Sequence, residues 1–336
     1  MKAYRKQVLA VLLIGSMVLL YGCGGQESVT PDTMNTPNVK ETMGEAGVPV
    51  ETELGTEPQE EGALSLTHIP KPADAISVGE NCFLGLHKDG TVVAAGRGDY
   101  GECDVDSWTD VIKVRSVWRS SIGLKKDGTM VVTGNAMDES DSFHQILEWT
   151  DIVDFDAMDA NLAALKSDGT VVGVGYRSDT AYVDWTRIVK VATNSSATIG
   201  LREDGTVLYH GSGSKGYNKS LITSWTDIAD IDIHDEGVIA LKTDGTVLIA
   251  YNKEIDVSGW KNVVAIFAGE EAMAIAADGT IYTSAGYAAD WTDIIAYDSN
   301  DIYALALRAD GTIVTTSDSN FFTGQSGSWT NIGTPE

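Results

Sequence analysis

The acidic side chains are the residues of this chain that could most readily do chemistry. The chain has 49 Asp and Glu against 23 Lys and Arg. Two facing carboxylates can hydrolyse a glycosidic bond, and several together can bind calcium, yet no pair is marked out by its spacing. The most regular acid belongs to Asp-Gly-Thr, which occurs seven times, at Asp89, Asp127, Asp168, Asp204, Asp244, Asp278 and Asp310. The turn preference of Asp-Gly explains this Asp, so a carboxylate-based glycan-processing enzyme is only a remote alternative.

The other potential nucleophiles, bases and metal ligands form no recognisable constellation. The five histidines occupy unrelated positions and are predicted to be solvated: His68, His87, His144, His210 and His234. No nucleophile elbow, His-Glu-x-x-His motif or phosphate-binding Gly loop occurs. The sequence therefore predicts no enzyme activity, no catalytic residue, no cofactor and no metal.

Cys23 lies in surroundings that indicate a covalent modification. Three cations precede the apolar run 8–20, which ends in Leu-Tyr-Gly-Cys at residues 20–23. This string resembles the lipobox of bacterial lipoproteins, in which the cysteine is diacylated and becomes the first residue; the alternative is an ordinary secretory signal with an incidental cysteine. We predict a signal peptide at 1–22, lipid attachment at Cys23, and a location at the extracytoplasmic face of a bacterial cell membrane.

Cys82 and Cys103 are the remaining cysteines. A disulfide between them is compatible with export. Two independent small apolar side chains are the favoured interpretation, because no other repeat of the chain contains such a pair.

The net charge and a polar segment limit the partners. A formal charge of −26 repels nucleic acid and anionic surfaces, so a basic protein surface or a neutral ligand is favoured. Residues 23–68 are rich in Thr, Glu, Gly and Pro, and we predict a disordered linker because they can bury little apolar surface.

A seven-fold repeat organises the remainder, 69–336. Tryptophan recurs at Trp108, Trp149, Trp185, Trp225, Trp260, Trp291 and Trp329. Each of the first six precedes an Asp-Gly by 19 residues, except the fifth, where the step is 18. A fixed half and an elastic half repeated in this way indicate one structural unit copied around an array.

Each unit predicts three or four antiparallel strands. Bulky apolar residues alternate with Gly or Ala before Asp-Gly, as in Leu84-Gly85-Leu86, which favours a strand whose small residue lets a neighbouring sheet approach. Asp-Gly then predicts a two-residue type I′ hairpin turn. Trp-Thr-Asp-Ile/Val is predicted to open a further strand, as at 149–155, and a short fourth strand is predicted at 102–105.

The chain ends predict that the array closes into a ring. Pro70 stands where the first unit should have its tryptophan, and Trp329 is followed by only seven residues and no hairpin. The segment around Trp329 can therefore complete the first unit, which removes the exposed edges of an open stack. We predict an all-β fold, a closed seven-bladed β-propeller.

The repeat resembles that of the regulator of chromosome condensation family. The resemblance rests on Trp-Thr-Asp-Ile-Val followed by Leu-Lys-x-Asp-Gly-Thr-Val-Val-x-x-Gly, and on Gly101 to Trp108, and it covers nearly all of 75–332. It implies a propeller that binds or regulates other proteins, since members inhibit β-lactamases or act as exchange factors for a small GTPase. The Gly-aromatic-aromatic-His turn of the family is largely replaced, at 79–82 and 117–120.

One face of the predicted propeller is the candidate partner-binding face. The turn that follows each first strand varies from unit to unit, and variable loops on a rigid frame usually carry binding residues. The candidates are Glu80, Asn81, Trp118, Arg119, Asp159, Asp235, Glu236, Glu270, Glu271 and Asp301. Trp118 lies outside the repeat register and is either an exposed contact residue or locally packed.

These features together predict a non-catalytic, membrane-anchored binding module for a protein or a cell-wall component. The alternative is a regulator or inhibitor of an enzyme, with inhibition of a β-lactamase fitting better than nucleotide exchange.

Overall fold

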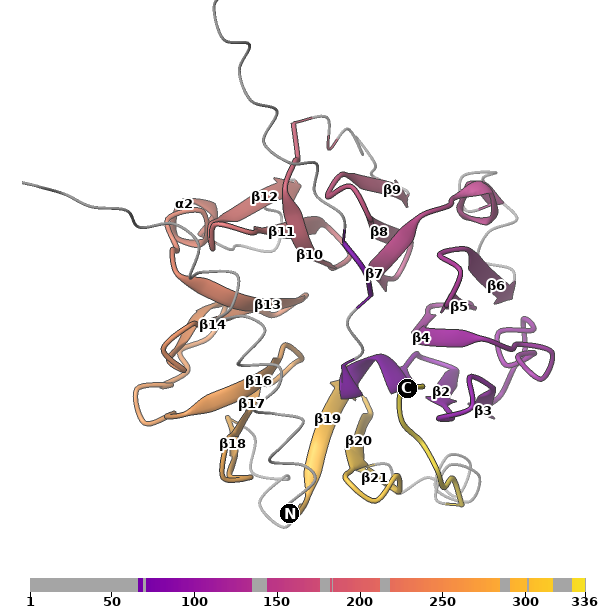
Figure 1. Ribbon diagram of the computed structural model, residues 1–336. Coiled ribbons are helices and arrows are strands. Elements are labelled where there is room, and N and C mark those ends of the chain that lie inside the picture. Colours follow the sequence, from indigo (N-terminus) through magenta and orange to yellow (C-terminus); the bar gives the residue numbers. More distant parts are fainter. Residues whose placement is uncertain are drawn as a thin grey trace, which may run out of the picture.

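Seven antiparallel sheets arranged around a common centre make up the fold (Figure 1). The computed structural model describes residues 66–68, 71–134, 144–175, 182, 184–211, 218–284, 291–300, 302–316 and 328–335. Each sheet has three strands that follow one another in the chain, and the first strand of a sheet lies nearest the centre. This is the arrangement of a seven-bladed β-propeller, as the repeat predicts.

The strand bounds show the repeat directly. The seven sheets are β1 (Ile76–Val78), β2 (Cys82–Leu86) and β3 (Val92–Gly96); β4 (Val111–Val117), β5 (Ser120–Lys125) and β6 (Met130–Gly134); β7 (Ile152–Met158), β8 (Asn161–Lys166) and β9 (Val171–Gly175); β10 (Ile188–Thr193), β11 (Ala197–Arg202) and β12 (Val207–Gly211); β13 (Ile228–His234), β14 (Gly237–Lys242) and β15 (Val247–Tyr251); β16 (Val263–Phe267), β17 (Met273–Ala276) and β18 (Ile281–Thr283); and β19 (Ile294–Ser299), β20 (Ala304–Arg308) and β21 (Ile313–Thr315). Among the described residues, three short helices lie outside the sheets: η2 (Pro72–Ala75), η3 (His144–Glu148) and α2 (Lys219–Ile222). The predicted fourth strand at 102–105 is wrong, because these residues form turns and extended chain.

The small residue of each second strand is explained by the repeated tryptophan. An added Cβ at Gly123 would lie 3.0 Å from the ring of Trp108, and one at Gly200 would lie 2.6 Å from that of Trp185. The tryptophan that precedes a sheet therefore packs on the middle strand of that sheet. Trp108 also belongs to the apolar core of the first sheet, so the small residue makes room for a side chain that lies between two sheets.

The Asp-Gly turn differs from the predicted type I′ hairpin. Among the described residues, glycines such as Gly90 (φ 84°) have a positive φ, but none of the seven Asp does. Gly90 N–H donates to His87 O and His87 N–H to Thr91 O, both at 2.9 Å, the pattern of a three-residue type I turn with a glycine bulge. Asp89 Oδ1 accepts Thr91 N–H at 3.0 Å and the Thr91 hydroxyl at 2.6 Å, which lowers the pKa of Asp89. Asp-Gly-Thr is thus one hydrogen-bonded unit.

Trp-Thr-Asp forms a bend before the strand and is not part of it, contrary to the prediction. The third residue has a φ between 54° and 63° in every unit, at Asp110, Asp151, Arg187, Asp227, Asn262, Asp293 and Asn331. Such a φ favours the Asp and Asn found at most of these positions. The strand begins at the next residue, as at Ile152.

This bend makes a hydrogen bond to the sheet before it, and the residues that follow Trp329 make hydrogen bonds of the same kind to the seventh and first sheets. Val111 N–H donates to Gly90 O at 3.1 Å. At the chain ends, Ile332 N–H donates to Gly311 O at 3.2 Å, and Gly333 N–H to Leu86 O at 2.9 Å. Trp329 lies on Gly85, where an added Cβ would be 2.8 Å from its ring.

Side chains near the axis also bind each sheet to the next. Asp156 accepts Thr193 N–H at 2.8 Å, and Asp232 accepts Ala268 N–H at 2.7 Å. Asp298 likewise accepts Val78 N–H at 2.7 Å, which joins the seventh sheet to the first. The half-buried acids that alternate with apolar residues at 154–156 and 230–232 are thus all bound to neighbouring sheets.

Residues 66–68 and 71–75, which precede β1, lie at the centre of the circle (Figure 1), and Lys71 and Asp74 complete a network of charges there. Asp74 lies 3.2 Å from Lys113 Nζ, which also lies 2.5 Å from Asp154. Lys71 lies 3.3 Å from Asp230, which is 2.5 Å from Lys190. Cations and carboxylates from four strands and from the segment before β1 therefore neutralise one another in a largely buried centre.

Asp232 gives this network a measurable pH dependence. Its burial, with the nearby charge of Asp156, raises its pKa to about 6 although Lys190 opposes the shift. A raised folded-state pKa means that stability is complete below the unfolded value of about 4 and is lost as pH rises through about 6. We expect the wild type to lose about 1–3 kcal/mol relative to Asp232→Asn between about pH 4.5 and 7.5. Urea unfolding measures this loss. The exposed-site control Asp256→Asn should show a flat difference, and an equally flat result for Asp232→Asn would contradict the assignment.

Candidate partner-binding face

The propeller has two distinct ends. One end, the hairpin face, carries the seven Asp-Gly-Thr turns. The other, the turn face, carries the turns from the first to the second strand, and the chain leaves the third strand there, as Arg97 N–H donates to Asn81 O at 2.9 Å. The up-and-down order of three strands places these two kinds of loop at opposite ends, as the sequence predicts.

The described candidates all lie in first turns of their sheets but are spread around the circle. Glu80 and Asn81 are in the first sheet, Trp118 and Arg119 in the second, Asp159 in the third, Asp235 and Glu236 in the fifth, and Glu270 and Glu271 in the sixth. Asp301 and Cys23 lie outside the described residues. Whether these residues bind a partner stays a prediction.

Two of the acids are already bound within the propeller. Asp235 accepts the Ser195 hydroxyl at 2.7 Å, which links the fourth and fifth sheets. Glu271 accepts Lys253 Nζ at 2.5 Å and the Ser284 hydroxyl. Burial tends to raise the pKa of Glu271, but these hydrogen bonds lower it below its ordinary value. Both acids therefore stabilise the turns as well as contributing charge.

Trp118 and Arg119 form a compact cluster with Tyr100. The Arg119 guanidinium carbon lies 4.2 Å from the centroid of each of the two rings. Trp118 remains 43% exposed and Tyr100 36% exposed. We call these three residues the aromatic–arginine cluster. Trp118 is thus both exposed and locally packed, and the cluster rigidly presents two rings and a cation at the turn face.

Tyr100 was missed by the sequence analysis because its loop has no counterpart in the other repeats. The loop after β3 is held against the second sheet. The Thr133 hydroxyl donates to Gly101 O at 3.0 Å, and the Ser121 hydroxyl to Glu102 O at 2.6 Å. Tyr100 N–H donates to Glu102 Oε2 at 2.8 Å. The position of Tyr100 is therefore set by contacts between the first and second sheets.

Cys82 and Cys103 form a disulfide, with Cα atoms 5.9 Å apart. The favoured interpretation of two independent side chains was wrong. The loop after β3 folds back so that Cys103 meets Cys82 at the start of β2, and the spacing of the two cysteines in the sequence does not reveal this path. The disulfide fastens this loop to the first sheet. The hydroxyls of Thr133 and Ser121, which donate to carbonyl groups of the loop, fasten it to the second sheet.

We expect Cys103→Ser to lower the free energy of unfolding by about 2–4 kcal/mol, because a covalent loop of this size restricts the unfolded chain. Denaturant unfolding measures the loss, and wild-type protein in reductant should match the variant. Alkylation of denatured wild-type protein, followed by mass spectrometry, should leave Cys82 and Cys103 unlabelled. Labelling of both would contradict the assignment.

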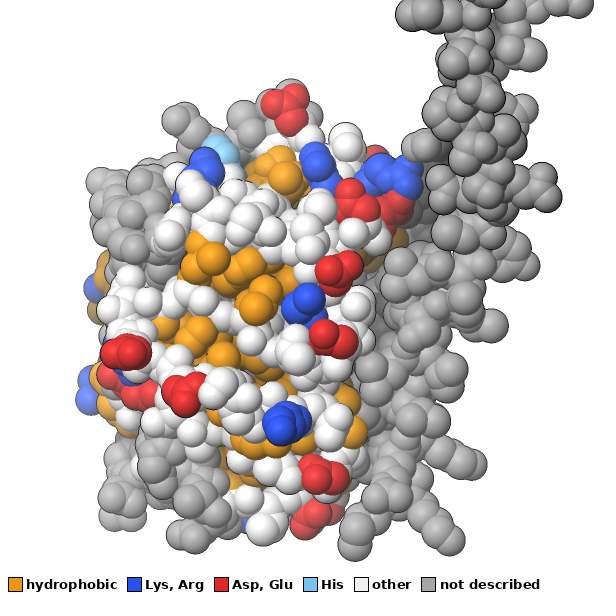
Figure 2. All heavy atoms as spheres, turned by 90° about the vertical axis from the view of Figure 1, so that its left-hand side faces the viewer, with side chains coloured by type: hydrophobic (Ala, Val, Ile, Leu, Met, Phe, Trp, Pro, Cys, Tyr) orange, Lys and Arg blue, Asp and Glu red, His pale blue; other side chains and the backbone are white. Residues whose placement is uncertain are grey.

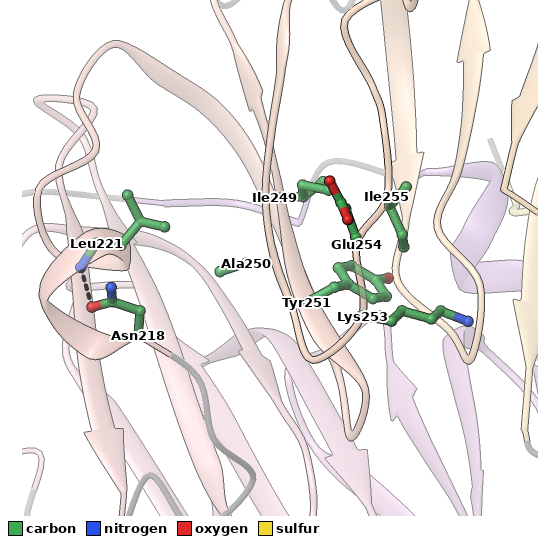
Figure 3. A pocket seen from close by; sticks show the side chains of 8 residues that line it. All are labelled: Asn218, Leu221, Ile249, Ala250, Tyr251, Lys253, Glu254 and Ile255. Carbon is green, nitrogen blue, oxygen red and sulfur yellow. Dashed lines mark hydrogen bonds between the residues drawn. The ribbon is translucent and has the colours of Figure 1, made fainter.

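A shallow pocket of about 280 Å³ lies on the rim, between α2 and the end of β15. Figure 2 shows that hydrophobic side chains gather on this side of the molecule, interrupted by both signs of charge. In Figure 3, Leu221 and Asn218 lie on one side and Ile249, Tyr251 and Ile255 on the other. Its lysine, Lys253, is already paired with Glu271. Asn218 Oδ1 accepts Leu221 N–H, and the Tyr251 hydroxyl contacts Gly269 O, so three of the four polar side chains that line the pocket are already engaged within the protein.

The described residues show neither a metal site nor a membrane-spanning helix. No group of three His, Cys, Asp or Glu within them is placed to bind a metal ion. No helix among them is long and apolar enough to cross a membrane. The prediction that all histidines are solvated was wrong, because His234 is buried and His68 Nδ1 pairs with Val153 O at 2.8 Å.

Comparisons with known proteins identify the fold but no family. No protein-family model matches the chain, and no curated protein is significantly similar to its sequence. The WD40 ectodomain of the Arabidopsis thaliana receptor kinase ACR4 has a similar structure, with a TM-score of 0.55, 15% identity, and coverage of 78% of this chain and 96% of that chain. The ectodomain of the Physcomitrella patens receptor kinase CR4 matches with a TM-score of 0.55, 13% identity, and coverage of 72% of both chains.

The regulator predicted by resemblance is also among the matches. Prp20p of Saccharomyces cerevisiae gives a TM-score of 0.43 at 14% identity, covering 77% of this chain and 75% of that chain; this low score supports no conclusion. The ectodomain matches, with the seven sheets, confirm the predicted propeller architecture. Membership of the regulator of chromosome condensation family stays a prediction.

Proposed function

We propose that the chain is a non-catalytic, membrane-anchored, extracytoplasmic module that binds a protein partner through the turn face. The aromatic–arginine cluster is the observation that carries this proposal. Exposed Trp, Tyr and Arg are the residue types that contribute most to protein interfaces. They are held here by two sheets of a rigid frame, so little conformational freedom is lost on binding.

The path of the chain before β1 supports display of this face. Leu66 N–H donates to Ser167 O at 2.6 Å, next to the Asp-Gly of the third sheet. The chain therefore reaches the propeller at the hairpin face, opposite the cluster. With a lipid on Cys23, the turn face would lie at the end of the propeller opposite the point where the chain from the anchor reaches it. The ACR4 propeller, too, is part of an ectodomain.

Photo-crosslinking on intact cells tests the proposed binding. A photoreactive residue at Glu80 or Glu270, on the turn face, should capture a defined partner, whereas one at the exposed Lys126 or Thr243, on the hairpin face, should not. Trp118→Ala should abolish the capture at Glu80. Leu147→Ala, which removes another exposed apolar side chain (51% exposed), should leave it intact. Equal capture from both faces, or capture insensitive to Trp118, would refute the proposal.

The anchor is tested separately. Cys23→Ser should prevent incorporation of labelled fatty acid and move the protein from the membrane fraction to the soluble exported fraction. Unchanged fractionation of this variant would remove the lipid anchor from the proposal while leaving the binding face intact.

A further inference from the structure

We infer that the aromatic–arginine cluster is a docking site for a carboxylate that a protein partner presents beside an apolar side chain. This inference rests on the proposed function and specifies the chemistry of the partner. It concerns a single contact, because the formal charge of −26 still disfavours partners that are acidic overall.

The first observation is that Arg119 has no acidic partner in the part of the chain that the structure describes. Its recorded contacts are the rings of Tyr100 and Trp118. By contrast, Arg115 is paired with Asp156 and Arg187 with Glu203. A guanidinium that lies over aromatic rings keeps its in-plane N–H groups available for a bidentate carboxylate.

The second observation is the apolar setting of this cation. Both rings are partly exposed, Trp118 at 43% and Tyr100 at 36%. A partner that covers them would exclude water from Arg119 and thereby strengthen its hydrogen bonds to a carboxylate. The same rings would accept an apolar side chain next to the acid. The combination of Trp, Tyr and Arg favours a protein over an acidic glycan as the source of the carboxylate.

The third observation is that the site is formed before any ligand binds. The turn that carries Arg119 is backed by Gly134, where an added Cβ would lie 2.2 Å from Arg119 O. Tyr100 is held by the disulfide-fastened loop. A cation fixed in this way can distinguish a carboxylate from an amide, because its N–H groups do not need to reorganise.

Selection of short random peptides on the full chain in detergent micelles tests the inference. Selected peptides should contain Asp or Glu next to an apolar residue. Each would be remade with Gln or Asn in place of the acid and measured against the wild type and Arg119→Gln. Loss of either charge should weaken binding about 10- to 100-fold, and loss of both should add little more. Arg119→Lys should also weaken binding, because lysine lacks the planar fork.

The controls separate this inference from the proposed function. Arg97→Gln removes an exposed arginine of the same loop and should leave peptide affinity within about twofold. Peptides that depend on Trp118 but carry no acid would overturn the carboxylate inference while the binding face stands. Binding of acidic glycans through Arg119, with no peptide selected, would also overturn it. The absence of any Trp118-dependent ligand would refute the proposed function itself. Thermal unfolding of each variant confirms that the fold is retained.

Discussion

Replacement of Lys113 by methionine is expected to lower the free energy of unfolding by about 3–5 kcal/mol. Lys113 is 4% exposed and lies between Asp74 and Asp154. Methionine retains the apolar stem but removes the charge, so two carboxylates near the axis lose their shared cation. Breaking a buried ion pair in this way costs far more than the intact pair contributes, because the remaining charges stay desolvated.

Urea unfolding of the full chain, followed by far-ultraviolet circular dichroism, measures this loss. Lys242→Met is the matched control, because Lys242 lies 3.9 Å from Asp227, whose side chain is 67% exposed. Its loss should cost about 0.5 kcal/mol or less. Similar values for the two variants would show that the central charges are as well solvated as the surface pair.

The pH dependence of the same variant provides a second measurement. Burial tends to raise the pKa of Asp154, but Lys113 more than reverses this and lowers it. Asp154 therefore stabilises the wild type fully above the unfolded pKa of about 4, and this stabilisation is lost as pH falls through the lower folded value. Lys113→Met removes the cation that lowers the pKa of Asp154. The variant should therefore lose less free energy of unfolding than the wild type when the pH is lowered below about 4.

The propeller could be predicted from the sequence because its signals are local and occur seven times. The Leu84-Gly85-Leu86 alternation and the tryptophan spacing each specify one element of the unit. Even so, turn type required the structure. The residue before Asp-Gly is part of the loop, which makes it a three-residue loop. The Thr hydroxyl also donates a hydrogen bond to the Asp carboxylate, as from Thr91 to Asp89. Neither effect follows from the Asp-Gly dipeptide alone.

The central network and the cluster were not predictable because they depend on contacts between sheets. Alternating acid and apolar residues, as in Asp154-Phe155-Asp156, have the same pattern whether the acids face water or a cation of the next sheet. The sequence identified Trp118 and Arg119 through their departure from the repeat. Tyr100 lies in the elastic half, where no internal comparison is available, and only the path of the loop shows that it reaches Arg119.

Trp329→Ala is expected to cost about 3–5 kcal/mol, as for truncation of any large buried aromatic residue, although it changes a position only seven residues from the last residue of this sequence. Trp329 is 9% exposed and packs on Gly85 of the first sheet. Trp108, which is 7% exposed, packs in the same way on Gly123. If Trp329 covers Gly85 as firmly as Trp108 covers Gly123, then Trp329→Ala and Trp108→Ala remove equivalent contacts.

Thermal and urea unfolding of Trp329→Ala, Trp108→Ala and Trp118→Ala would therefore separate two states of the ring. In a joined ring the first two variants lose similar stability, and the exposed Trp118 loses about 1 kcal/mol or less. A chain that stops after residue 327 should then be at least as unstable as Trp329→Ala, because it also loses the hydrogen bonds of Ile332 and Gly333. If the last segment were loosely attached, Trp329→Ala would instead resemble Trp118→Ala. The last segment meets the first sheet through Trp329 on Gly85 and a single bridge between His87 and Ile332, so its removal would uncover apolar surface of that sheet. Exposed apolar surface favours association between chains, and light scattering of the truncated chain therefore shows whether the last segment covers this surface.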